Sequence, residues 1–188
     1  MKIPVLFTES DSNYKLFENF DAYDLERNAF NYSDRLPLIA HPPCRLFSRL
    51  RKFSNAPTHE KECAFFALLK IRQFGGILEH PRSSLLWKTG NFDITGNVDN
   101  YGGFLRSVNL SWFGYPCAKK TMLYFVGISP GQLPEFPLSF DAITHQISSS
   151  KKKSLPEISK NSRSSTPVAM IDYFIKVIDI INNNKSIL

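Results

Sequence analysis

The sequence from Glu60 to Pro81, EKECAFFALLKIRQFGGILEHP, contains the clearest structural pattern of this chain. Between Glu60 and Phe74 the apolar side chains recur at spacings of three and four, which is typical of an amphipathic helix. Gly75 and Gly76 follow, and glycine commonly ends a helix. Residues 77–79 are apolar until their last position, so a short buried strand is expected to leave the helix and end beside a histidine and a proline.

Short apolar runs on both sides of this stretch predict more strands. They lie at residues 3–7, 21–25, 36–40, 104–110 and 122–128. A short helix is expected at residues 14–20, and a longer amphipathic helix opens at Pro167 and runs to about Ile181. Strands that alternate with helices in this way form a mostly parallel sheet with helices on both faces, so the sequence predicts an α/β fold. Ligands of such sheets bind outside the carboxyl ends of the strands.

Composition divides the chain into three parts. Residues 1–147 are expected to form one domain, and residues 148–165 are rich in Ser and Lys and predict a flexible linker. Residues 166–188 are expected to form a helix that docks on the domain. Its docking residues are predicted to be Val168, Ile171, Phe174, Ile175 and Ile178.

Charge and cysteine content suggest the kind of partner and the compartment. The formal net charge of +6 fits an anionic partner such as nucleic acid, although a solvated surface and a basic tail would also produce it. The three cysteines form no CxxC pair, and no segment reaches the roughly 18 apolar residues of a membrane span. We therefore expect a cytoplasmic protein with free thiols and no membrane partner.

Three predicted strands are followed by loops of unusual composition. The first loop is His41-Pro42-Pro43-Cys44-Arg45-Leu46-Phe47-Ser48. Its two prolines fix the backbone in front of the thiol, and Arg45 would favour the reactive thiolate of Cys44. A buried structural cysteine after a stiff turn is the alternative interpretation.

The other two loops carry an acidic and a basic group. Glu79 ends an apolar strand, where a carboxylate is costly to bury without a partner or a task. A salt bridge to Arg82 or Arg72 is the alternative. The third loop, residues 112–121, reads WFGYPCAKKT and taken alone is a turn with exposed lysines.

Together and in this order, the three loops resemble the cytosine-C5 DNA methyltransferases. The family pattern Gly-Pro-Pro-Cys-Gln-x-Phe-Ser is matched by residues 41–48, and Glu-Asn-Val by residues 79–81. The later pattern Tyr-Gly-x-Pro-Gln-x-Arg-x-Arg, with an apolar strand after it, resembles residues 113–127. The chain is also similar to a group of short phage and prophage proteins with His-Pro-Pro-Cys, Glu-His-Pro and Gly-His-x-x-x-Lys-x-Thr segments. The resemblance covers residues 36–128.

This resemblance implies a reduced, Rossmann-like fold of the class I methyltransferase type, which transfers a methyl group from S-adenosylmethionine to cytosine C5 in DNA or a nucleotide. Cys44 would add to C6 of the base, Glu79 would hold N3 and the amino group, and Lys119 would help to fix the base. The implied cofactor-binding residues are Asp24, Glu9 and Pro43. The implied contacts to the base or nucleic acid are Arg45, Ser48, Arg82 and Lys120.

Two departures from the family pattern affect this reading. The glycine-rich cofactor loop should follow the first strand, yet residues 8–13, TESDSN, contain no glycine. Only residues 129–188 follow the third motif, too few for the family's target-recognition domain, so a separate protein would have to read DNA sequence.

Two other functions are open on the same residues. The first is a catalytically lapsed protein of phage origin that binds a nucleotide or nucleic acid, as an accessory or anti-restriction factor. The second is a Cys/His metal-dependent enzyme, in which His41, Cys44, His80 and Cys117 would converge on zinc. The remaining histidines and cysteine and the two tryptophans are expected to be structural or surface residues; they are His59, Cys63, His145, Trp87 and Trp112.

Overall fold

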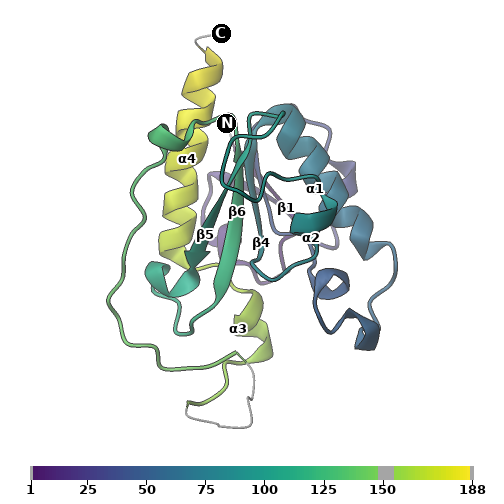
Figure 1. Cartoon of the computed structure of the whole chain (residues 1–188), viewed down its shortest axis with the longest axis vertical. Coiled ribbons are helices and arrows are strands. Elements are labelled where there is room, and N and C mark those ends of the chain that lie inside the picture. Colours follow the sequence, from purple (N-terminus) through teal and green to yellow (C-terminus); the bar gives the residue numbers. More distant parts are fainter. Residues whose placement is uncertain (1, 148–154, 187–188) are drawn as a thin grey trace.

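The computed structural model describes residues 2–147 and 155–186. A six-stranded sheet in the order β2-β1-β3-β4-β6-β5 forms its centre (Figure 1). The strands are β1 (Ile3–Leu6), β2 (Phe20–Tyr23), β3 (Leu38–Ala40), β4 (Gly76–Pro81), β5 (Phe104–Asn109) and β6 (Lys120–Val126). The first four pair with one another in parallel, whereas β6 is antiparallel to both β4 and β5.

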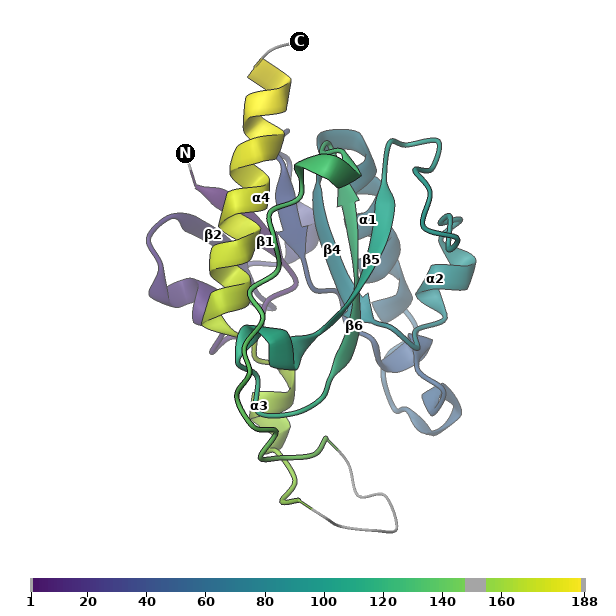
Figure 2. The same cartoon turned by 60° about the vertical axis from the view of Figure 1, so that its left-hand side comes forward.

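Helices lie on both faces of this sheet. They are α1 (Glu60–Phe74), α2 (Leu86–Thr89), α3 (Lys160–Ser164) and α4 (Val168–Ser186). Single 3-10 turns connect the main elements: η1 (Asn13–Leu16), η2 (Ala29–Asn31), η3 (Arg45–Phe47), η4 (Arg51–Phe53), η5 (Leu110–Phe113) and η6 (Pro130–Gln132). Figure 2 shows α1 and α4 on opposite sides of the strands. The predicted α/β class is therefore confirmed.

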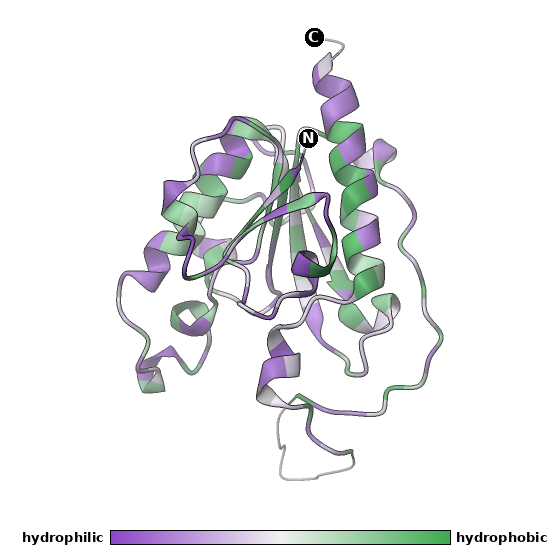
Figure 3. Ribbon diagram, turned by 180° about the vertical axis from the view of Figure 1, so that it is seen from behind, coloured by the Kyte–Doolittle hydropathy of each residue, from purple (hydrophilic) through white to green (hydrophobic). Residues whose placement is uncertain are grey.

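Two apolar cores follow from the alternation of side chains along each strand. Ile39 and Ile77 face α4 and pack in one cluster with Phe174. Their neighbours Leu38 and Leu78 face α1 and belong to the second cluster. We call these sides of the sheet the α4 face and the α1 face. In Figure 3 the apolar side of α4 lies toward the strands.

The helix α1 has the predicted bounds and ends at Gly75, whose φ is 77°. Gly76 opens β4 with a φ of 134°, and a Cβ atom there would collide with the carbonyl oxygen of Leu38 on β3. Glycine is therefore required where these two strands first pair, and this pairing sets the register that positions the site.

Between residues 2 and 147 the structure differs from the expected elements in three places. Residues 14–20 form the single turn η1 followed by the start of β2, rather than a helix. Helix α2 was not predicted. β6 reverses direction because only residues 110–119 join it to β5, and a connection without a crossover pairs two strands antiparallel.

The C-terminal helix docks, but through a different set of side chains from the one predicted. Ile171, Phe174 and Ile178 are buried as expected, whereas Val168 is 48% exposed and Ile175 is half-buried. Four further residues complete the buried side: Met170, Tyr173, Val177 and Ile181. The apolar cluster on the α4 face of the sheet therefore includes the buried side of this helix.

The predicted flexible linker differs from the structure over part of its length. Residues 148–154 lie outside the described residues. Residues 155–165 contain α3 and make long-range hydrogen bonds, so they are not a simple tether. We call residues 155–167 the C-terminal strap. Within the described ranges, no helix is both long and apolar enough to cross a membrane.

Candidate functional site

The order of the strands reverses at β1, because β2 lies on one side of it and β3 on the other. The carboxyl ends of β1 and β3 therefore form a topological switch point, where sheets of this kind bind ligands. Phe7, the first residue after β1, has a φ of 62°, which is rare for a residue with a Cβ atom. Its ring packs edge-on against Phe30 and Phe66. Aromatic packing thus holds a backbone turn that glycine usually makes.

Four polar side chains on the α4 face form a hydrogen-bonded chain across this edge of the sheet. The hydroxyl of Tyr14 and Nε2 of His41 lie 2.9 Å apart, and Nδ1 of His41 lies 3.1 Å from Oε2 of Glu79. Thr121 donates from its hydroxyl to Oε1 of Glu79 at 2.9 Å. The chain links the turn after β1 to the ends of β3 and β4 and to the start of β6.

Glu79 is held as an ionised carboxylate. Burial alone would raise the pKa of Glu79, but the hydrogen bond from His41, the charge of Lys119 and the hydrogen bond from Thr121 lower it to about 2. Because a carboxylate only accepts, His41 donates to it from Nδ1. The alternative of a salt bridge to Arg82 or Arg72 is wrong, since Arg72 lies beside Asp99 and Arg82 is exposed.

Cys44 lies within electrostatic reach of Glu79, but its thiol is not activated at rest. Burial raises the pKa of Cys44, and the negative charge of Glu79 raises it further, against smaller opposite effects of Lys119 and Arg45. Arg45 forms an ion pair with Glu60, the first residue of α1. Arg45 does act on Cys44 in the expected direction, but burial and the charge of Glu79 outweigh it, so the pKa of the thiol is raised.

Lys119 completes this group. Its charge acts on both Cys44 and Glu79, and its Nζ donates to the carbonyl oxygen of Arg163 in the C-terminal strap at 2.8 Å. The structure thus brings together the three predicted catalytic residues at one edge. This follows from the sheet, because β3 pairs with β4, and β4 pairs with the strand that Lys119 precedes.

The other predicted site residues are spread along the same edge. Arg82 and Lys120 are exposed and adjacent, because the amide of Arg82 donates to the carbonyl of Lys120 at 3.2 Å. The hydroxyl of Ser48 donates to the carbonyl of Arg45 at 3.0 Å. Glu9 is exposed and Pro43 is half-buried.

The residues expected to bind the cofactor, after β1 and β2, form hydrogen bonds and an ion pair within this chain instead. Asp24 follows β2, but its Oδ2 lies 2.5 Å from Nζ of Lys15, and this hydrogen bond is the largest cause that lowers the pKa of Asp24. In the turn after β1, Asn13 donates to the carbonyl of Thr166 at 2.8 Å and to the hydroxyl of Ser165 at 3.2 Å. With no glycine in residues 8–13, these groups do not fit S-adenosylmethionine.

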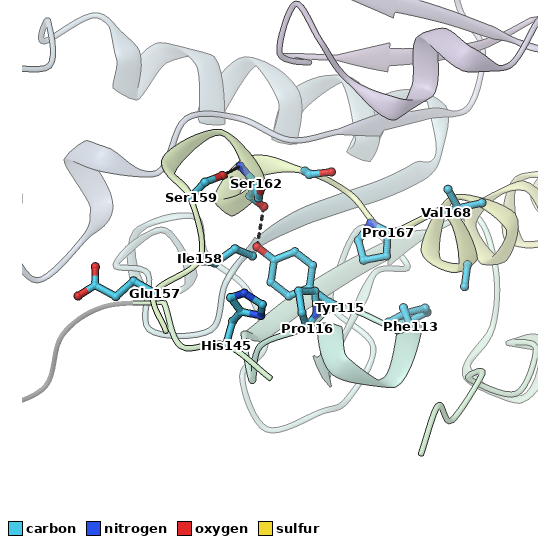
Figure 4. Close-up of a pocket in the computed structure, with 13 residues that line it drawn as sticks. Phe113, Tyr115, Pro116, His145, Glu157, Ile158, Ser159, Ser162, Pro167 and Val168 are labelled. Atoms are coloured by element: carbon cyan, nitrogen blue, oxygen red, sulfur yellow. Dashed lines mark hydrogen bonds between the residues drawn. The ribbon is translucent and has the colours of Figure 1, made fainter. Parts of the chain in front are cut away.

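An open cavity of about 780 Å³ lies beside the C-terminal strap (Figure 4). Tyr115 projects into it from the loop before β6, and its hydroxyl donates to the carbonyl of Ser162 at 2.7 Å. Neither Cys44 nor Glu79 lines this cavity. The expected pocket between those two side chains therefore stays a prediction, although the strand ends that carry them lie side by side.

The four side chains considered for zinc do not converge. His41 lies on the α4 face near Phe174, whereas His80 lies on the α1 face between Phe47 and Trp87. Throughout residues 2–147 and 155–186, no three His, Cys, Asp or Glu side chains are grouped to hold a metal ion. Of the residues expected to be structural or at the surface, Cys63 and Trp87 are buried, Trp112 and His145 are half-buried, and His59 is exposed.

Sequence reasoning missed the part played by His41, Tyr14 and Thr121. The sequence does contain one signal for His41. This residue stands where the methyltransferase pattern has glycine, and it directly follows the predicted strand 36–40, which neighbours the strand of Glu79. The hydrogen bonds of Tyr14 and of the C-terminal strap depend on tertiary packing and leave no pattern in the sequence.

Comparison of the chain with protein-family models, with curated proteins and with solved structures finds no match.

Proposed function

We propose that this protein binds a nucleobase, in DNA or in a nucleotide, beside Cys44 and Glu79 at the carboxyl edge of the sheet. The observation that carries the proposal is the state of Glu79, an ionised carboxylate kept in place by two hydrogen bonds at the end of an apolar strand. A carboxylate offers about four lone-pair positions, so acceptor sites are left for a ligand. The similarity of the three loops to the cytosine-C5 methyltransferases supports a base as that ligand.

An ionised carboxylate prefers bases that donate hydrogen bonds. At the C4 position cytosine has an amino group that donates to the carboxylate of Glu79, whereas uracil has a carbonyl oxygen there that would face the carboxylate. The preference rests on this C4 contact, because N3 accepts in neutral cytosine and donates in uracil. A hydrogen bond to a charged group contributes about 1.5–3 kcal/mol, which is roughly tenfold or more in affinity. The site is therefore expected to bind cytosine more tightly than uracil.

Calorimetry with dCMP and dUMP tests this preference. We expect dCMP to bind at least about tenfold more tightly, and Glu79→Gln to remove most of the difference, because an amide both donates and accepts. Glu62→Gln, an exposed position on α1, is the matched control and should behave as the wild type. Equal affinities for the two nucleotides, or an unchanged preference in Glu79→Gln, would disprove the assignment.

Methyl transfer to cytosine C5 is the second candidate, favoured by the grouping of Cys44, Glu79 and Lys119. It requires the thiolate of Cys44 to add to C6 of the base, whereas burial and Glu79 raise the pKa of this thiol. The turn after β1 also does not fit the methyl donor. For these two reasons we propose base binding, in an accessory protein of the methyltransferase plan, ahead of catalysis.

A covalent trap separates the two candidates. DNA that contains 5-fluorocytosine should form a stable adduct with Cys44 in the presence of S-adenosylmethionine if the protein transfers methyl groups, since fluorine at C5 blocks release of the cysteine. Intact-mass measurement detects the adduct, and Cys44→Ser should abolish it. A protein that shows the dCMP preference but forms no adduct binds the base without modifying it.

A further inference from the structure

The loop that follows Cys44 exposes cations and apolar groups together. Arg49, Arg51 and Lys52 are all exposed, and between and beside them Leu50 is 70% and Phe53 is 85% exposed. We call residues 49–53 the basic loop. A single exposed apolar residue is common, but two of them among three cations form a mixed surface of the kind that binds nucleic acid.

The charge of the basic loop is not neutralised within the chain. Residues 45–59 contain no acidic side chain, and Glu60, the next one, forms an ion pair with Arg45. Among the described residues, Arg49, Arg51 and Lys52 take part in no ion pair with a carboxylate. The loop therefore presents three positive charges to an anionic partner.

The basic loop is continuous with the candidate site. The amide of Leu85 donates to the carbonyl of Phe47 at 2.9 Å, which ties the base of the loop to the segment after β4. Arg82 and Lys120 are exposed next to that segment, and the backbone hydrogen bond between them keeps them adjacent, with Lys119 directly before Lys120. In Figure 1 the basic loop and the C-terminal strap both lie below the sheet, the loop on the α1 side.

We propose that the basic loop binds single-stranded nucleic acid, and that Arg82 and Lys120 carry the strand onward across Cys44 and Glu79. This inference rests on the proposed function, because the bound strand would bring its base to the site beside Cys44 and Glu79. The cations contact phosphates, and an unpaired base stacks on the ring of Phe53. A single strand is favoured over a duplex because its bases reach a carboxylate at a sheet edge without first being flipped out of a stack.

Fluorescence anisotropy with a labelled single strand of about twelve nucleotides tests the proposal between about 50 and 200 mM salt. Replacing Arg49, Arg51 and Lys52 together by Ala should lower the slope of log affinity against log salt by about 2, since each contact to a single strand contributes about 0.7. The matched control replaces Lys2, Arg35 and Lys176 by Ala. These cations are exposed on α4 or before β1 and β3, away from the carboxyl edge, and should leave the slope nearly unchanged.

Phe53→Ala tests the stacking contact by itself. It should weaken binding about fivefold or more, the lower end of the contribution of one base on an aromatic ring. Phe140→Ala is its control, because Phe140 is 95% exposed on another segment. All substituted side chains are exposed, so thermal unfolding should be unchanged in each variant.

Three results would overturn the proposal: no binding of the single strand at the lowest salt, a salt slope unchanged in the triple variant, or duplex binding as tight as single-strand binding. Failure of the proposed function looks different. The single strand would then bind with the expected effects of the variants, but calorimetry would show no preference for dCMP over dUMP. If dCMP were preferred over dUMP but no oligonucleotide bound, only the proposed role of the basic loop would be disproved.

Discussion

His80 makes the stability of this protein dependent on mildly acidic pH. It is completely buried, and neither ring nitrogen has a hydrogen-bond partner in the part of the chain that the structure describes. Burial lowers the pKa of His80 from 6.5 to about 4, against smaller upward effects of Glu79 and the Pro43 carbonyl. As pH falls below 6.5, His80 binds a proton in the unfolded chain but not in the folded one. The free energy of unfolding is therefore unaffected by His80 well above pH 6.5 and decreases between pH 6.5 and 4. The loss amounts to about 2 kcal/mol between pH 7 and 5 and about 3 kcal/mol in full.

Urea unfolding at pH 7, 6 and 5 measures this loss. With a slope of about 2 kcal/mol per M, the midpoint should fall by about 1 M between pH 7 and 5. His80→Phe keeps an aromatic ring between Phe47 and Trp87 and should remove most of the decrease, whereas His59→Phe, an exposed control, should keep it. A wild-type midpoint that does not move, or one that falls equally in His80→Phe, would show that burial does not hold this histidine neutral.

Three further predictions concern the candidate site, helix α4 and the C-terminal strap. Glu79→Gln should speed alkylation of Cys44 by iodoacetamide near pH 8, measured by mass spectrometry, because the charge of Glu79 raises the pKa of that thiol. Phe174→Ala should lower the free energy of unfolding in urea by about 3–5 kcal/mol, since its ring is fully buried between α4 and the sheet. Asn13→Ala should expose the C-terminal strap to limited proteolysis at lower protease concentration than in the wild type, because it removes two hydrogen bonds to that segment.

The parts of the fold that repeat a local pattern could be predicted from the sequence. Helix α1 has the bounds that its apolar spacing and Gly75 indicate. The strands lie within a few residues of the expected runs, and the parallel pairing of β3 with β4 places Cys44 and Glu79 at one edge. The helix and each strand are encoded within about twenty neighbouring residues, where side-chain periodicity is informative, and the pairing of β3 with β4 follows from the strand-helix-strand order of residues 38–81.

The parts that depend on distant contacts could not be predicted. Burial and the charge of Glu79 outweigh the expected effect of Arg45 on Cys44, and nothing in a one-dimensional pattern indicates this balance. The buried set of α4 is shifted from the predicted one, because Val168 stands at the first turn beyond the sheet while Ile181 reaches Gly75 and Gly127. The expectation of a flexible linker rests on composition, and composition does not show the backbone carbonyls through which residues 155–167 contact the domain.

The C-terminal strap favours base binding from the side of the basic loop over a cofactor at the switch point. Asn13, Tyr115 and Lys119 each donate a hydrogen bond to a backbone carbonyl of the strap. A ligand that had to displace these contacts would lose about 1 kcal/mol for each, or roughly a hundredfold in affinity for the three together. A base that enters past Arg82 needs none of them to break. The donors that hold the strap are therefore a physical reason why a fold of this type would recognise a base without also holding a methyl donor.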